Sequence, residues 1–208
     1  MAFLSTKSVT LLFFFILGIF STAESGDPDP IVDYLTFPLG ATANGTFFTF
    51  TGLRSAFTEF PPNFKPTKAT FVEFPALLSQ SVSMAILQYP AGSLNPPHTH
   101  PRSAELLLVV SGSLQVGFVD TTNQLFNQTL QLGDMFLFPK GLVHFQFNAD
   151  PRNSATAIAA FASANPGTVS LPPTVFTSGI SDEVLAQAFK TDVVVIQSIK
   201  AGLAPPPS

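Results

Sequence analysis

The chain has 208 residues, of which 46% are hydrophobic, so it can form one domain with a sizeable core and is not intrinsically disordered. Its formal net charge is −4 and its basic residues form no cluster, so we expect no surface for nucleic acid or anionic lipid. The sequence contains no cysteine, which excludes thiolate metal sites, iron–sulfur clusters and cysteine nucleophiles.

Residues 1–23 have the form of a secretory signal peptide. Lys7 supplies a positive charge, Val9–Phe20 is an unbroken apolar run, and Ser21-Thr22-Ala23 has the small residues of a cleavage site. The run has 12 residues, whereas a membrane helix needs about 20. We therefore expect a secreted protein that is cleaved after Ala23 and has no membrane span; an uncleaved anchor is the alternative.

Two Asn-X-Thr sequons follow, at Asn44 and Asn127. Each is a short match, but behind a signal peptide both become expected sites of N-glycosylation. Asn127 lies in the polar stretch TTNQLFNQT, which predicts a surface turn or hairpin.

The segment 24–70 is rich in Pro, Gly, Thr and Phe and shows little helical periodicity, so it predicts an extended arm and edge strands. From residue 71 to 170, short β-prone runs alternate with turn signals, a spacing typical of an antiparallel sandwich or barrel. The predicted strands are Ser83–Tyr89, Glu105–Val110, Leu114–Val119, Met135–Phe138, Val143–Phe147 and Ala155–Ala162.

The final segment, 171–208, changes to a helical pattern. Ser181 is a good N-cap for a helix over Asp182–Phe189, and a second helix is predicted over Val193–Lys200, before Gly202. Each helix has an apolar face. The two helices either pack on their own barrel or contact a neighbouring subunit.

All three histidines of the chain fall in two short blocks. His98 and His100 are two residues apart, so on a strand their side chains point to the same side. Pro101 cannot continue a central strand, and a turn there would bring Glu105 back towards the two imidazoles. His144 returns on a strand after the turn Pro139-Lys140-Gly141. Three imidazoles and one carboxylate suit Mn, Fe, Zn, Ni or Co.

The first block resembles the first cupin motif. Gly92, His98, His100, Glu105 and Gly112 stand at that motif's spacings.

The second block resembles the second cupin motif, with Gly133, Pro139, Gly141, His144 and Asn148 in register. The strings NPPHTHPRSAE and GDMFLFPKGLVHFQFN, and the early segment DPDPIVDY, are similar to germin-like proteins, so the resemblance covers nearly all of the expected mature chain.

This resemblance implies an all-β fold, a cupin jelly-roll β-barrel with a short C-terminal α-helical segment. It implies manganese bound by His98, His100, Glu105 and His144, with iron or zinc as the alternative metal. It also implies a glycoprotein of the apoplast and cell wall that forms a homo-oligomer, a hexamer built as a trimer of dimers. Superoxide dismutase or oxalate oxidase activity would serve plant defence or development.

Two departures from the germin-like pattern bear on function. The family's N-terminal disulfide is absent, with Leu35 at the first expected cysteine. Oxalate oxidases carry two Asn side chains near the metal; Asn95 matches one and could position substrate or water, but Ala85 stands at the other. Because an oxalate dianion needs polar partners, we expect superoxide dismutase rather than oxalate oxidase activity. A non-enzymatic cell-wall or receptor role is the third alternative.

Overall fold

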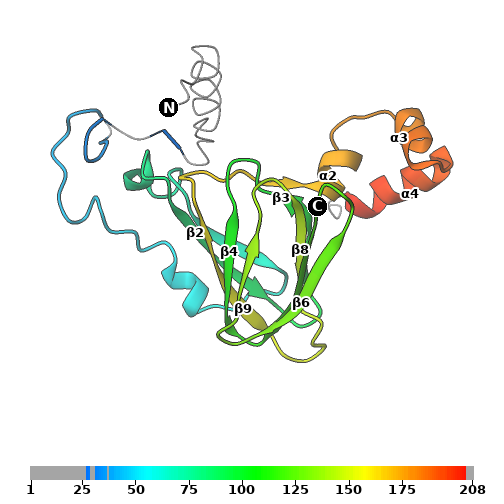
Figure 1. Cartoon of the computed structure of the whole chain (residues 1–208), viewed down its shortest axis with the longest axis horizontal. Helices are drawn as coiled ribbons and strands as arrows, with labels where there is room; N and C mark the ends of the chain where they lie inside the picture. The colour runs from blue at the N-terminus through cyan, green and yellow to red at the C-terminus, as the bar shows by residue number, and fades with distance from the viewer. Residues whose placement is uncertain (1–26, 29–30, 37, 205–208) are drawn as a thin grey trace, which may run out of the picture.

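The structure is a computed structural model that describes residues 27–28, 31–36 and 38–204. In this part of the chain, two antiparallel five-stranded sheets lie face to face (Figure 1). The first sheet has the order β1-β2-β9-β4-β7 and the second β10-β3-β8-β5-β6. The strands are β1 Lys65–Ala69, β2 Ser83–Tyr89, β3 Leu94–Thr99, β4 Glu105–Ser111, β5 Ser113–Val119, β6 Leu125–Gln131, β7 Met135–Phe138, β8 Val143–Phe147, β9 Ala155–Phe161 and β10 Val169–Ser170. This arrangement confirms the predicted all-β barrel.

The core forms between the sheets because alternate strand residues point inward. In β4, Leu107 and Val109 are fully buried, and Leu114 and Val116 of β5 face them from the second sheet. Strand β9 contributes small side chains, since Ala155, Ala157 and Ala159 alternate with half-buried residues. The six predicted strands are present, with ends that differ by at most one residue.

Strand β3 carries the first histidines although it contains two prolines. The pairing of β3 with β8 shifts register between Asn95 and His98, which places Pro96 and Pro97 where the ladder is irregular. A proline has no N–H to donate, so it is tolerated at such a point.

The polar stretch around Asn127 forms a hairpin, as predicted, although Asn127 itself lies on a strand. The Asp120 carboxylate accepts hydrogen bonds from the backbone N–H groups of Thr122 and Gln124, at 2.8 and 2.9 Å, and closes the turn. Strand β6 then pairs with β5 and is the outer strand of its sheet. Asn44 and Asn127 are both exposed.

The C-terminal segment contains three helices, α2 Leu171–Phe176, α3 Asp182–Phe189 and α4 Val193–Leu203. Helix α3 has its predicted bounds, and the Ser181 hydroxyl accepts a hydrogen bond from the N–H of Val184 at 3.4 Å. Helix α4 continues through Gly202, three residues beyond the predicted end, and α2 was not predicted.

The helices α3 and α4 project to one side of the barrel (Figure 1). They bury Leu185, Ala186 and Ile196 against one another, with Val175 and Phe176 of α2 packed alongside. Helices α3 and α4 therefore bury their apolar side chains mainly against each other and α2, and not against the barrel. Several large apolar side chains of α3 and α4 remain exposed: Val184, Phe189, Val194, Val195, Ile199 and Leu203.

The described residues before the barrel have little regular structure. The described part of residues 27–64 contains only one short 3-10 helix, η1 Arg54–Phe57, and a second, η2 Pro75–Leu77, lies between β1 and β2. Strand β1 is the outer strand of its sheet. The predicted signal peptide, 1–23, lies outside the described residues. Within them, no helix has the length and apolar character needed to cross a membrane.

Candidate metal centre

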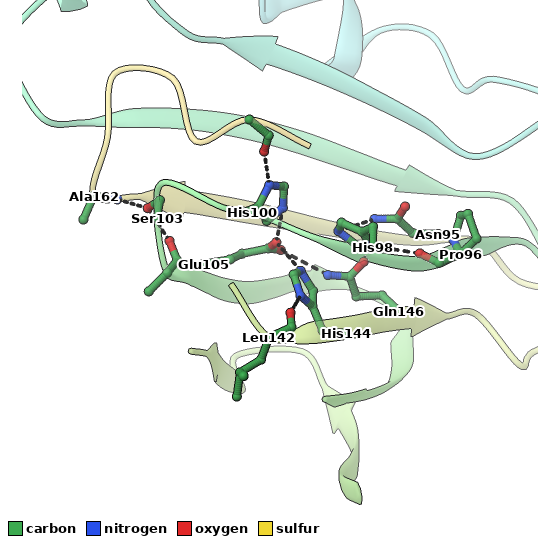
Figure 2. Close-up of polar contacts among 12 residues, drawn as sticks. Asn95, Pro96, His98, His100, Ser103, Glu105, Leu142, His144, Gln146 and Ala162 are labelled. Carbon is green, nitrogen blue, oxygen red and sulfur yellow. Dashed lines mark hydrogen bonds and ion pairs between the residues drawn. The ribbon is translucent and has the colours of Figure 1, made fainter. Parts of the chain in front are cut away.

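The structure brings the four predicted ligand residues together from both sheets. His98 lies on β3 and pairs directly with His144 on β8, while His100 follows β3. Residues 101–102 form the predicted turn, and Glu105 begins β4 in the opposite sheet. One ligand atom from each of the four side chains can be chosen so that all lie within 4.8 Å of one another (Figure 2).

The turn between His100 and Glu105 is held by Ser103. Its hydroxyl accepts a hydrogen bond from the backbone N–H of Ala162 at 2.8 Å and donates to the carbonyl of Ala104 at 2.6 Å. Ser103 is almost fully buried. This contact joins the start of β4 to the end of β9, and so sets where the Glu105 carboxylate enters the barrel.

Each imidazole is oriented by a backbone carbonyl. The Nδ1 atoms of His98 and His144 lie 2.8 Å from the carbonyls of Pro96 and Leu142. The Nδ1 of His100 lies 2.5 Å from the carbonyl of Gly167. A carbonyl can only accept, so each Nδ1 carries the proton and each neutral ring has its lone pair on Nε2.

The Nε2 atoms and the carboxylate face one another. Glu105 Oε2 lies 3.0 Å from His100 Nε2 and 3.2 Å from His144 Nε2. In neutral rings with Nδ1 protonated, these are contacts between two acceptors, which repel unless a cation lies between them or a ring gains a second proton. The donor set therefore fits a metal ion.

Burial of the four side chains strengthens the repulsion between the Nε2 lone pairs and the Glu105 carboxylate. His98, Glu105 and His144 are each 2% exposed. Burial and the neighbouring His144 lower the pKa of His98 to about 4, so this ring is neutral at pH 7. Burial alone would raise the pKa of Glu105, but in the metal-free site the adjacent His100 and His144 rings, which donate to the carboxylate when Nε2 takes up a second proton, lower it to about 2. At neutral pH the site thus holds a buried negative charge that needs a positive partner.

Two phenylalanines fix the outer faces of the rings. Phe138 stacks on His144 with 4.5 Å between ring centroids, and Phe161 meets His100 edge-on at 4.8 Å. Both phenylalanines are buried. They exclude water from behind the ligands and limit the rotation of two of the rings.

Gln146 is a site residue that the sequence reasoning missed. It is fully buried, and its Nε2 donates to Glu105 Oε1 at 3.1 Å (Figure 2). Its Oε1 accepts from Asn95 Nδ2 at 2.6 Å and from the Tyr89 hydroxyl at 3.4 Å. The available signal was its position two residues after His144 on the same strand, which places both side chains on one face.

Asn95 lies beside the four clustered side chains of His98, His100, Glu105 and His144. Its Nδ2 is 3.5 Å from His98 Nε2 and is held by Gln146. A cavity of about 330 Å³ opens onto this position. It is lined by Ala85, Asn95, His98, His100 and Glu105 together with apolar side chains that include Phe64, Met84 and Leu87. Ala85 therefore presents only a methyl group to the cavity.

Comparison with known proteins agrees with the geometry. A family model described as Cupin matches residues 44–197. The chain is 58% identical over 191 residues to "Germin-like protein 9-3" of Oryza sativa subsp. japonica, with 88% of each chain covered. It is 48% identical over 141 residues to "Rhicadhesin receptor" of Pisum sativum, with 67% of this chain and 64% of that protein covered.

Solved structures give the same result. A structure described as "Structural and spectroscopic insights into the mechanism of oxalate oxidase" matches with a TM-score of 0.75 and 31% identity, and covers 86% of this chain and 98% of that one. The fold and the buried cluster of three histidines and a glutamate define a cupin. The chain belongs, within the cupins, to the germin-like proteins.

Proposed function

We propose that this chain is a secreted, manganese-binding germin-like protein of the plant apoplast and cell wall that dismutates superoxide, with a role in defence or development. The observation that supports a metal is the approach of imidazole Nε2 atoms to one buried carboxylate, at 3.0 and 3.2 Å. His98, His100, Glu105 and His144 would hold the ion. The donor set alone does not select manganese, because zinc binds such a set more tightly; manganese rests on the family, with iron or zinc as alternatives.

When bound, a redox-active metal would exchange one electron with each superoxide, so that two superoxide anions and two protons give dioxygen and hydrogen peroxide. The chain's own residues would bind and orient the small anion. The Asn95 amide points to the ligand cluster and would position substrate or water there, because Gln146 holds it at 2.6 Å.

Tyr89 and Gln146 keep this amide network in one orientation. Burial and the charge of Glu105 raise the pKa of Tyr89 well above its ordinary value, so its hydroxyl stays protonated and donates to Gln146. The cavity of about 330 Å³ admits a small substrate.

We also propose that the chain forms a homo-oligomer, a hexamer arranged as a trimer of dimers. Support comes from the exposed apolar side chains on α3 and α4, among them Phe189 at 55% and Val194 at 70% exposed. A patch of this kind on a small helical projection is typical of a protein–protein contact. N-glycans at Asn44 and Asn127 are part of the same proposal.

Oxalate oxidation is the second candidate, and the similarity to oxalate oxidase structures supports it. Ala85 argues against it, since a methyl group lines the cavity at the position where oxalate oxidases are expected to carry their second Asn beside the metal. An Ala85→Asn variant should therefore gain hydrogen peroxide release from oxalate. A receptor role, as in the name of the pea relative, needs no catalysis.

The test is metal analysis of protein purified from plant secretions, paired with superoxide and oxalate assays. We expect about one manganese per chain, and loss of both metal and superoxide consumption in His98→Ala but not in the exposed control Gln128→Ala. Zinc or iron at the same stoichiometry would overturn the choice of manganese. Metal without superoxide consumption would overturn the proposed activity, and oxalate turnover in the wild type would favour the second candidate.

A further inference from the structure

The N-terminal arm is bonded to the loop that follows β9. Asp27 Oδ1 accepts a hydrogen bond from the Ser163 hydroxyl at 2.8 Å, and Asp27 Oδ2 accepts from the backbone N–H of Ala164 at 2.5 Å. The Ser81 hydroxyl donates to the Asp27 carbonyl at 3.3 Å. Both carboxylate oxygens of Asp27 are thus engaged with residues far away in sequence.

The same loop continues to the residue that orients His100. The Ser163 hydroxyl accepts from the N–H of Asn165 at 3.1 Å, and the Asn165 side chain accepts from the N–H of Gly167 at 3.3 Å. The Gly167 carbonyl then accepts from His100 Nδ1. A continuous series of hydrogen bonds therefore runs from Asp27 to a predicted metal ligand.

His100 differs from the other two ligand histidines in this respect. His98 and His144 bond to carbonyls two residues before them, so each is oriented locally by its own chain segment. The carbonyl that orients His100 is 67 residues away in sequence. The direction of the His100 ring therefore depends on where the loop lies.

Arg102 gives the loop a second set of contacts. Its Nε donates to the Asn165 carbonyl at 2.6 Å, and its backbone N–H donates to the Pro166 carbonyl at 3.2 Å. Gly167 has a φ of +68°, and a side chain there would come within 2.8 Å of the Arg102 guanidinium. With these contacts intact, loss of the Asp27 carboxylate should displace the loop rather than unfold it.

We propose that Asp27 is a positioning residue for the metal centre: it bonds the N-terminal arm to the loop 163–167 and so holds His100 in its ligand orientation. The inference rests on the proposed metal site but not on the proposed reaction. The chain has no cysteine, so no disulfide can fasten the arm, and the Asp27 carboxylate does so instead. Residues that orient a metal ligand typically change metal affinity by 10–100-fold when they are replaced.

The first measurement uses the metal-free mature chain with ¹⁵N-labelled histidine. Only three histidines are present, so each ring can be followed separately by NMR. In Asp27→Ala, we expect the Nδ1–H of His100 to exchange with solvent at least about 10-fold faster, while His98 and His144 are unchanged. Asp33→Asn is the matched control, because Asp33 is an exposed acid on the same arm.

The second measurement is Mn²⁺ affinity by competition with a chelator. Asp27→Ala should weaken binding about 10-fold, Asp27→Asn should lie between it and the wild type, and Asp33→Asn should bind normally. Equal effects on all three rings, or an unchanged His100 ring in Asp27→Ala, would overturn the proposal. The NMR comparison decides the role of Asp27 even if the wild type binds no manganese, so the two proposals can fail separately.

Discussion

Asn148 completes the second cupin motif, yet its contacts give it an architectural role. The side chain is fully buried at the end of the strand that carries His144. Its Nδ2 lies 3.1, 3.0 and 2.8 Å from the carbonyls of Tyr89, Pro90 and Asn153, and its Oδ1 accepts from the N–H of Asp150 at 3.1 Å. One amide therefore joins the end of β2 to the turn before β9.

Replacing Asn148 with Ala should destabilise the protein by about 3 kcal/mol. Two N–H donors and one acceptor are lost, and each such hydrogen bond contributes about 1 kcal/mol. For a chain of this size, that loss lowers the melting temperature by about 6–12 °C. The amount of metal bound by the folded variant should not change, because none of the hydrogen bonds of Asn148 goes to a ligand side chain.

Thermal unfolding followed by circular dichroism, with and without a chelator, measures the effect. Asn153→Ala is the matched control: its exposed side chain makes one hydrogen bond, to Asp150, so the change should stay within about 0.5 kcal/mol. A normal melting temperature combined with loss of metal in Asn148→Ala would refute the reasoning and place Asn148 in the metal site.

Three further predictions concern charge, assembly and modification. The pKa of Glu105 is lowered from 4.5 to about 2, so its ionised carboxylate adds to the free energy of unfolding of the metal-free protein above pH 4.5. This contribution is lost as the pH falls towards 2. Glu105→Gln should therefore reduce the pH dependence of the free energy of unfolding measured by urea titration. Replacing Phe189 and Val194 together with Ser should lower the mass seen by light scattering while the circular dichroism spectrum stays native, since both side chains are exposed in the single chain; an unchanged mass would locate the subunit contacts elsewhere. If Asn127 carries an N-glycan, protein produced in plant cells from the full chain should lose one glycan in Asn127→Gln. The loss is seen as a mass difference that enzymatic deglycosylation abolishes, and equal masses before deglycosylation would count against this site.

Much of the candidate metal site could be predicted from local sequence. His98 and His100 are two residues apart, and a strand turns such residues to one face for steric reasons that hold in any fold. Pro101 ends the strand, so the turn that returns Glu105 was also predictable. The ends of α3 followed in the same way from the Ser181 cap and the apolar spacing.

The tertiary structure decided the contacts that no local pattern specifies. Gln146 of β8 accepts a hydrogen bond from Asn95 of the neighbouring strand β3, and the orientation of the His100 ring is set by the carbonyl of Gly167, 67 residues away in sequence. The stretch from Leu94 to Thr99 becomes a strand despite its prolines, because a register shift against β8 accommodates them. Strand periodicity and turn chemistry act over a few residues and can be seen in the sequence alone. Which carbonyl or amide meets a given side chain depends on how distant segments pack, and only the folded chain determines that.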